Sequence, residues 1–370
     1  MIMMLKRSVL IGGLALSAAG VFCQPVHQDI FSEKYITAMI EKTADWQLQH
    51  PKHDPKDWTN GAFYAGMTAA WQTTNSSKIY DALIQIGEAQ QWQPFKRWYH
   101  ADDIAVCQTY IDLYRTKKDP GIIRPTIDTI DLFLSRPYPQ KSKVETIKWW
   151  WCDALFMAPP VLVKLAAVTH DRKYLEANDL YFRQTYELLY DKEEHLFARD
   201  LNYVIKPDGT GKKESNGKKI FWSRGNGWVM GGLVRVLQEL PQNYSKRAFY
   251  ESLLIQMAGR VAQLQQPDGL WRASLLNAQA YPGGEVSGSG FFCYALAWGI
   301  NNKLLDKKKF EPIVRKAWRG LVNCVDEYGR VGWVQPIGAS PGKGFNEDSW
   351  EVYGTGAFLF AASEVLKLKK

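Results

Sequence analysis

The sequence has few cysteines, and none of them has the spacing of a metal site or a disulfide framework. Of the five, Cys23 falls in an N-terminal leader. The other four stand in apolar, helix-like surroundings: Cys107, Cys152, Cys293 and Cys324. Such surroundings favour buried free thiols, and zinc is not indicated. The sequence therefore implies no metal and no cofactor.

The chain also lacks an internal linker and, beyond its first residues, a long apolar run. No central stretch is rich enough in Pro, Gly or Ser to separate domains, and no later segment is long enough to cross a membrane. With 46% hydrophobic and 23% charged residues, disorder and fibrous structure are excluded. We expect one large domain over residues 24–370.

The first 23 residues form the pattern of a secretory signal peptide. Lys6 and Arg7 precede an apolar stretch that ends at Phe22, and polar sequence follows from Gln24. This pattern predicts a cleaved leader and a secreted or periplasmic protein. Attachment of lipid at Cys23 is the alternative, but the bulky Phe22 before it argues against a lipoprotein.

Acidic residues are fewer than basic ones, and tryptophan is unusually common. Lys and Arg number 46 against 38 Asp and Glu, a formal charge of +8. Because the excess is scattered, it favours an acidic substrate over nucleic acid. The 15 tryptophans suit a large helical core, and equally a groove that stacks on sugars.

Strand-like alternation is rare, and apolar residues recur at helical spacing from residue 30 onward. We expect twelve helices, at about 30–48, 61–74, 78–92, 101–117, 121–136, 152–168, 172–190, 225–240, 245–266, 287–301, 307–325 and 353–367. Every second helix is apolar nearly all round, whereas the others are amphipathic. A helix that is apolar on every side must be covered on every side. The alternation therefore predicts an all-α (α/α)6 toroid, with six inner helices inside six outer ones.

Internal repetition supports this architecture. Three of the expected inner helices open with a small–polar–small pattern, at 225–227, 288–290 and 354–356, and each follows a short extended segment, at 195–199, 269–272 and 329–333. Glycines at these positions let helix starts approach one another or leave N–H groups open to a ligand. Pro159-Pro160 fits a helix interior poorly and predicts a kink or a late helix start.

Carboxylates stand at the starts of two expected inner helices, and these starts should gather at one end of the ring. Asp102 and Asp103 open one helix and Asp153 opens another. Aspartate at such a position is often only an N-cap. However, Asp153 follows three tryptophans, and apolar surroundings raise a carboxyl pKa toward that of a general acid. Adjacent residues lie about 100° apart on a helix, so one of Asp102 and Asp103 can point into the lumen.

Arg224 precedes the Gly225-Asn226-Gly227 helix start, where a guanidinium and free N–H groups can hold a carboxylate ligand. Pairing with a structural carboxylate is the alternative. Of the histidines, only His100 is assigned a functional role, because it stands beside the aspartate pair. The rim tryptophans are either core or sugar-stacking residues: Trp151, Trp222, Trp228 and Trp333. There is no nucleotide fingerprint and no Ser-His-Asp order.

Taken together, these motifs resemble the unsaturated uronyl hydrolases of glycoside hydrolase family 105 and, more distantly, family 88. The resemblance runs from about Ile30 to the C-terminus. It is carried by four motifs: His100-Ala101-Asp102-Asp103, the segment from Trp151 to Pro160, Arg224-Gly225-Asn226-Gly227-Trp228, and Tyr353-Gly354-Thr355-Gly356-Ala357-Phe358. Such enzymes adopt a six-hairpin α/α toroid, which agrees with the helix count.

The resemblance implies roles for individual residues. Asp153 resembles the catalytic acid/base, Asp103 (or Asp102) the second carboxylate, and Arg224 and Trp228 the substrate-binding pair. Many relatives carry a His where this chain has Arg199, so the preferred sugar or linkage is expected to differ here.

The implied substrate is an oligosaccharide with a 4,5-unsaturated glucuronyl or galacturonyl residue at its non-reducing end. The implied reaction is acid/base hydration of the double bond by one carboxyl group. Two other classes remain open: another toroid enzyme, either an inverting glycosidase or a lyase, and a secreted glycan-binding protein without activity.

Overall fold

The computed structural model describes residues 29–368. The predicted signal peptide, Cys23 and the boundary at residue 24 lie outside this range, so the leader and domain boundaries stay predictions. Within residues 29–368, no helix is both long and apolar enough to cross a bilayer.

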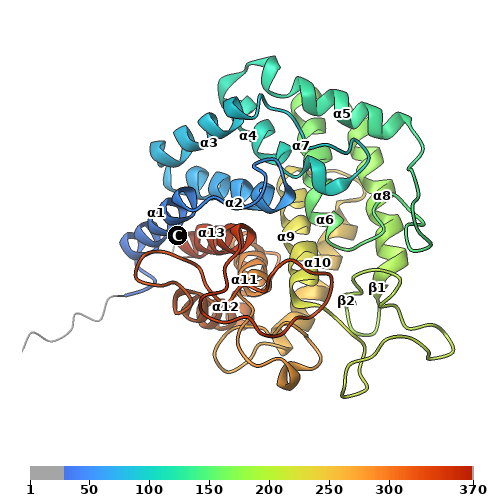
Figure 1. Ribbon diagram of the computed structural model, residues 1–370, viewed down its shortest axis with the longest axis vertical. Helices are drawn as coiled ribbons and strands as arrows, with labels where there is room; N and C mark the ends of the chain where they lie inside the picture. The colour runs from blue at the N-terminus through green and yellow to red at the C-terminus, as the bar shows by residue number, and fades with distance from the viewer. Residues whose placement is uncertain (1–28, 369–370) are drawn as a thin grey trace, which may run out of the picture.

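Six helices form a closed inner ring (Figure 1). In chain order they are α2 (Trp58–Thr74), α4 (Cys107–Lys117), α7 (Pro159–Thr169) with the short α6 (Ala154–Met157) before it, α9 (Ser223–Glu239), α11 (Val286–Asn301) and α13 (Val352–Lys367). Each packs on the next, and α13 packs on α2 to close the ring.

Six further helices follow the inner ones in alternation and cover them from outside. They are α1 (Glu33–Gln49), α3 (Ser77–Ala89), α5 (Arg124–Ser135), α8 (Lys173–Leu189), α10 (Arg247–Gln263) and α12 (Lys307–Val322). The expected toroid of six helical hairpins is therefore confirmed, and each of the twelve expected segments contains an α-helix.

The pattern of burial explains why each helix takes its layer. In α11 every residue from Val286 to Ile300 is buried, as an inner position requires. In α12 the buried residues include Phe310, Val314 and Leu321, which recur at helical spacing on one face. The opposite face of α12 can therefore be charged and meet water.

Two expected helices are interrupted. The segment 101–117 begins as a 3₁₀ turn, η1 (Ala101–Ile104), before α4. Between α6 and α7 the helix breaks, and Pro159 and Pro160 occupy the first turn of α7. Proline fits a first turn because its missing N–H would have had no partner there. The predicted late helix start is confirmed.

The short extended segments before α9, α11 and α13 are parts of tight turns. The first contains β2 (Leu196–Phe197), which pairs antiparallel with β1 (Tyr190–Asp191). The other two are closed by backbone bonds from Gln266 N to Leu270 O and from Asp326 N to Arg330 O, each 3.0 Å. The predicted repetition is confirmed, although only the first copy contains a strand. Two further 3₁₀ turns, η2 (Pro120–Ile122) and η3 (Ala278–Ala280), stand in loops.

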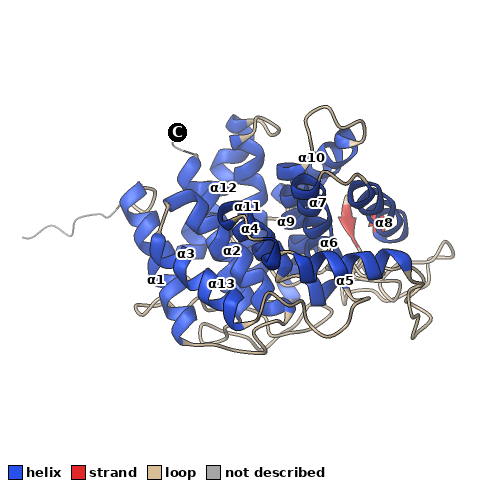
Figure 2. Cartoon of the chain, turned by 90° about the horizontal axis from the view of Figure 1, so that it is seen from above, coloured by secondary structure: helices blue, strands red, loops and turns tan. Residues whose placement is uncertain are grey.

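The N-terminal ends of the inner helices meet at one end of the ring, called here the mouth. Trp58, the first residue of α2, stacks on Tyr353 of α13 with ring centroids 5.3 Å apart, and its ring lies 5.9 Å from that of Trp228 of α9. Most of the long loops lie along this side of the molecule (Figure 2). The mouth therefore brings together residues that are far apart in the sequence.

Candidate active site

Asp153 lies in the turn that leads into α6 and is 9% exposed. The turn is held by a backbone bond from Cys152 N to Arg199 O, 2.9 Å long. Burial raises the pKa of the Asp153 carboxyl, and the nearby Arg199 guanidinium, with Nε 3.6 Å from Oδ2, opposes part of that rise. A carboxyl group whose pKa is raised by burial is suited to hold a proton and release it to a substrate.

Asp102 is the second carboxyl group facing this point. It belongs to η1, which packs on α6. Burial raises its pKa to about 8, and the negative charge of Asp153 adds to the rise. Two carboxyl groups that repel one another in this way favour a state in which at least one of them is protonated.

Asp103 faces the other way. Its carboxylate accepts from Arg97, at 3.0 Å from Nε and 2.6 Å from the backbone N, and a further bond comes from Nη2. Of the two aspartates, Asp102 is the one that interacts electrostatically with Asp153, whereas the sequence analysis favoured Asp103 as the second carboxylate. Neither serves as the N-cap of η1, because the imidazole of His100 accepts the capping bond from Asp102 N.

His100 stands beside Asp102 and packs on Trp151. Its Nδ1 lies 3.5 Å from Asp102 Oδ2, and its ring centroid lies 4.7 Å from that of Trp151. Burial lowers the pKa of His100 to about 3, and the positive charges of Arg97, Lys141 and Arg199 contribute to the decrease. The imidazole is therefore neutral at physiological pH and is a poor general base.

Arg199 is the cation paired with Asp153. Its Nη1 donates to Asp200 at 2.7 Å, and the guanidinium lies 5.4 Å from the ring centre of Trp150. The side chain is 20% exposed, and its Nε has no hydrogen-bond partner in the structure. The Nε of Arg199 is thus a buried donor that faces the Asp153 carboxyl group. Sequence reasoning missed Trp150, although its place in the run of three tryptophans was a signal.

Arg224 stands in the first turn of α9, at the helix start where the sequence placed it, and backbone groups cover its guanidinium. Its side chain is 0% exposed, and its Nη groups donate to the carbonyl groups of Gln335 and Pro336 and to the hydroxyl of Tyr353. Neither expected partner, a structural carboxylate or an open ligand site, is present among the residues described. The reason is the loop 334–351, which crosses the start of α9 and supplies the carbonyl groups. A carboxylate ligand for Arg224 would have to displace these bonds.

The predicted rim tryptophans separate into different environments. Trp228 is fully buried and packs on Phe156 and Phe291, with ring centroids 4.9 and 4.6 Å away. Trp222 is also buried and donates from Nε1 to Gln335 Oε1 at 3.2 Å. Trp333 is half-buried, outside the group around Asp153. Of the four, Trp151 packs on His100, which stands beside Asp102.

Gln335 was missed by the sequence analysis, and no sequence pattern pointed to it. Its backbone carbonyl accepts from both Arg224 and Tyr353, and its backbone N donates to Glu285. Its side chain binds Trp222 and the backbone at Gly342. One residue thus joins α9, α11 and α13 to the crossing loop at the mouth.

An α/α toroid with two interacting buried carboxyl groups of raised pKa at its mouth is typical of one class of protein, the toroid glycoside hydrolases. The chain belongs to glycosyl hydrolase family 88, whose model matches residues 31–369. Solved structures described as possible family 105 members, at 19% and 16% identity, share the fold. The resemblance drawn from the motifs is therefore confirmed, with family 88 as the family that matches.

Close relatives cover nearly all of the chain. An unsaturated 3S-rhamnoglycuronyl hydrolase of Formosa agariphila is 49% identical over 345 residues, which is 90% of this chain and 91% of that protein. A solved family 88 hydrolase from Bacteroides vulgatus is 31% identical with a TM-score of 0.83, covering 91% and 99% of the two chains. A structure described as a polysaccharide lyase is 34% identical with a TM-score of 0.82, covering 90% and 97%.

Proposed function

We propose that this enzyme removes a 4,5-unsaturated uronyl residue from the non-reducing end of oligosaccharides that a polysaccharide lyase has produced. The observation that carries the proposal is the Asp153–Asp102 pair, in which burial and mutual repulsion keep a proton available. The 49% identical relative, named an unsaturated 3S-rhamnoglycuronyl hydrolase, supports the substrate class. That name also supports a substrate in which the unsaturated uronyl residue is joined to rhamnose.

The reaction is hydration of an enol ether. The carboxyl group of Asp153 donates its proton to C4, which leaves an oxocarbenium ion shared by C5 and the ring oxygen. The resulting carboxylate then takes a proton from water as the water oxygen bonds to C5. The hemiketal opens to a ketone at C5, and the hemiacetal left at C1 expels the next sugar. One water is consumed, and no cofactor takes part.

Asp102, Arg199 and His100 support this chemistry from around Asp153. Asp102, whose pKa burial and the charge of Asp153 raise to about 8, holds a proton beside Asp153 before the reaction. Arg199 stabilises the Asp153 carboxylate after proton transfer. The partly exposed guanidinium of Arg199, next to Asp153, is the group we assign to the substrate carboxylate. Because a double bond is hydrated, the carboxyl separation that distinguishes retaining from inverting glycosidases does not apply.

The proposal is tested with a panel of unsaturated disaccharides, by following the absorbance of the double bond. Hydration consumes the double bond, so absorbance should fall, and Asp153→Asn should abolish the change. A lyase, the class suggested by one of the similar structures, creates a double bond, so absorbance would rise on a saturated polymer. The low pKa of His100 disfavours lyase chemistry at that residue, because a strong base must remove the C5 proton.

Secretion is part of the proposal. The charged and apolar pattern of residues 1–23 supports export with cleavage of the leader. The mass of the mature protein recovered from the periplasm or medium tests this. Retention of residues 1–23 would contradict it, and an added lipid on Cys23 would indicate the lipoprotein alternative.

A further inference from the structure

We propose that two basic loops, residues 136–148 and 204–220, form a binding surface for negatively charged sugars that follow the unsaturated residue in the oligosaccharide. This inference rests on the proposed function, since it extends the same site toward the leaving group. The groups that this surface recognises are anionic, either carboxylates or sulfate esters.

The two loops hold most of the positive excess of the chain, which the sequence analysis took to be scattered. The 136–148 loop has four cations and one acid, Glu145. The 204–220 loop has five lysines and two acids, Asp208 and Glu214. Six of the eight excess positive charges therefore stand in these two segments. The basic residues are Arg136, Lys141, Lys143, Lys148, Lys206, Lys212, Lys213, Lys218 and Lys219.

The acids of these loops do not neutralise the exposed lysines. Glu214 is 8% exposed and accepts from Ser274, from Asn277 and, at 3.2 Å, from the hydroxyl of Tyr281. Asp208 accepts two bonds from Thr210 within its own turn. Glu145 likewise binds groups of its own loop.

In the 204–220 loop, one lysine forms ion pairs with acidic residues, and three others are exposed and form none among the described residues. Lys219 binds Asp191 at 2.6 Å and Glu193 at 2.9 Å. The ion pairs found among residues 29–368 include none with Lys206, Lys213 or Lys218. These three ammonium groups are therefore available to an anionic ligand.

Both loops are joined directly to the candidate site. The 204–220 loop leaves the site just after Arg199 and returns to it at Trp222, and its first turn is fixed by a bond from Tyr203 N to Asp200 O, 2.9 Å long. The 136–148 loop leads into the turn that holds Asp153. Its Tyr138 hydroxyl accepts from Trp150 Nε1 at 3.1 Å.

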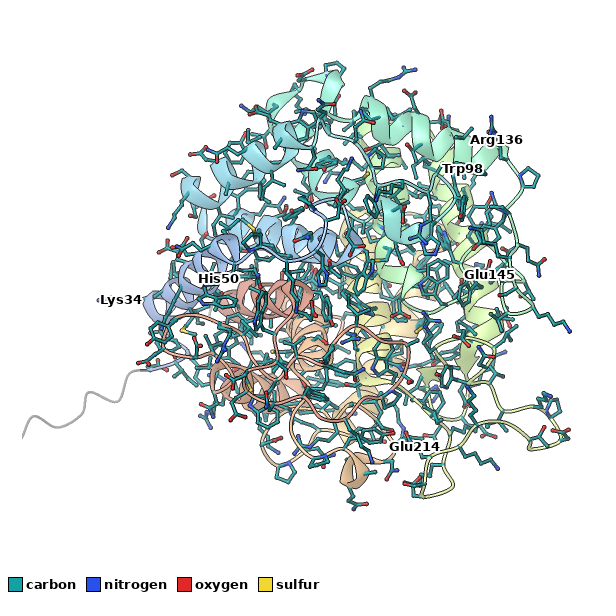
Figure 3. The ribbon with its side chains drawn as sticks, viewed as in Figure 1. Lys34, His50, Trp98, Arg136, Glu145 and Glu214 are labelled. Atoms are coloured by element: carbon teal, nitrogen blue, oxygen red, sulfur yellow. The ribbon has the colours of Figure 1, made fainter. Side chains whose placement is uncertain are left out.

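Lys141 brings a charge of the first loop close to the site, because its Nζ donates to the hydroxyl of Tyr99, the neighbour of His100. Figure 3 labels Glu145 in the 136–148 loop and Glu214 in the 204–220 loop, both in the right half of the view. An oligosaccharide whose first residue reaches Asp153 must extend its remaining residues away from the ring. Since both loops start or end beside the site, we infer that they flank this path, where positive charge raises the local concentration of an acidic ligand.

The test is a charge-neutralised loop with a matched control. Lys206→Gln/Lys213→Gln/Lys218→Gln removes three exposed charges from the 204–220 loop. Lys307→Gln/Lys308→Gln/Lys309→Gln removes three exposed charges at the start of α12. The control site is at the opposite end of the ring, where Lys307 lines a hollow with Asn301 and Leu368 at the C-terminal ends of α11 and α13.

Three substrates are compared at low and high salt: an unsaturated disaccharide with a neutral second sugar, an unsaturated tetrasaccharide with a further carboxylate, and a sulfated tetrasaccharide. For the loop variant we expect kcat/KM on the charged tetrasaccharides to fall by about tenfold at low salt. On the neutral disaccharide it should change less than about twofold, and high salt should erase the difference. A loss on one tetrasaccharide only would identify its anion as the ligand.

The inference is overturned if the loop variant and the α12 control behave alike, or if the disaccharide loses as much as the tetrasaccharides. Calorimetric binding of the tetrasaccharides in the Asp153→Asn background separates this outcome from failure of the proposed function. If the parent enzyme turns over no unsaturated substrate, the proposed function fails. Weaker binding by the loop variant than by the control would still support the anionic surface.

Discussion

At the scale of single residues, the chemistry depends on which carboxyl group carries the proton. Asp153→Asn keeps the shape of the protonated side chain but cannot donate or accept a proton. We expect kcat to fall by about 10²–10⁴-fold, with circular dichroism and melting temperature nearly unchanged. Steady-state kinetics on an unsaturated disaccharide measure the loss. Residual activity near the parent value would move the acid role to Asp102.

The two neighbouring aspartates should respond differently. Asp103 holds the backbone and guanidinium of Arg97, so Asp103→Asn should lower the melting temperature by loosening residues 94–100. Asp102→Asn should leave the fold intact and lower kcat by at least about tenfold, because it removes the partner that keeps the proton on the pair. Parallel melting curves and kinetics compare the variants. The reverse pattern would make Asp103 the second active-site carboxylate.

The raised pKa of Asp102 should also make the unfolding free energy depend on pH. A carboxyl group whose folded pKa, about 8, exceeds its ordinary value of 3.8 stabilises the fold fully at pH below about 3.8. That stabilisation is lost as pH rises toward and through 8. Asp102→Asn resembles the protonated form at every pH. We expect its unfolding free energy to exceed that of the parent by a few kcal/mol at pH 9 and to match it near pH 4. Urea titrations at both pH values measure this, and parallel pH profiles would contradict it.

The sequence identified the right neighbourhood but not the orientation of each side chain. The helix-start motifs brought Asp102 and Asp153 into consideration, and the family resemblance brought in Arg199. Which aspartate faces the site depends on a 3₁₀ turn and on Arg97, six residues earlier. The environment of Arg224 depends on a loop more than 100 residues away. Local patterns carry no information on such contacts.

At the scale of helices, a buried ionic cluster joins three members of the inner ring. Lys164 of α7 lies 2.6 Å from Asp112 of α4 and 2.9 Å from Glu239 of α9, and Arg115 also binds Glu239. Removing one partner from such a cluster leaves a buried charge unpaired. We expect Lys164→Met to lower the unfolding free energy by about 3–5 kcal/mol while the folded fraction keeps its KM. Denaturant titration with kinetics checks both. An unchanged midpoint would show that the cluster contributes little.

The same cluster predicts behaviour in acid. Burial alone would raise the pKa of Glu239, but the charges of Lys164 and Arg115 outweigh burial and lower it to about 2, from 4.5. Its stabilisation is therefore complete above about pH 4.5 and is lost as pH falls toward 2. The parent should lose stability across this window more steeply than Lys164→Met. Equal slopes for the two proteins would remove Glu239 as the cause.

Helix positions were predictable because inner and outer helices have different apolar patterns, and each predicted segment contains a helix. Helix starts were less predictable. The α2 helix begins at Trp58 and α9 at Ser223, a few residues before the apolar pattern becomes clear. For α2 the start is fixed by Asp57, whose side chain accepts from Thr59 N. The early start of α2 brings Trp58 into the mouth, where the sequence analysis did not expect it.

At the scale of the whole molecule, glycines in the repeated motifs allow the inner helices to close into a ring. A Cβ on Gly227 would lie 3.1 Å from the Cα of Gly288 in the next inner helix, and one on Gly290 would lie 2.9 Å from Ala357. The expectation that these glycines permit close approach is confirmed. The ring's final contact is between α13 and α2, which joins the C-terminal and N-terminal hairpins.

The contact between α13 and α2 can be tested by substitution of a glycine. A Cβ on Gly356 would lie 2.5 Å from the carbonyl oxygen of Ala62 in α2, and the clash is with backbone, which cannot turn aside as a side chain can. Gly356→Ala should therefore separate α13 from α2 and lower the unfolding free energy by about 1–3 kcal/mol or more. The matched control is Gly259→Ala in α10, where an added Cβ meets nothing within 4 Å. There alanine should stabilise the helix by up to about 1 kcal/mol.

Because Tyr353 stands at the start of α13 and binds Gln335 at 2.7 Å, separation of α13 from α2 should also disturb the mouth. We expect Gly356→Ala to raise KM while Gly259→Ala leaves it unchanged. Denaturant titration and kinetics on both variants measure the two effects. If Gly356→Ala were as stable as Gly259→Ala, the contact between α13 and α2 would have room that the backbone distances do not allow, and ring closure would not depend on glycine at this position.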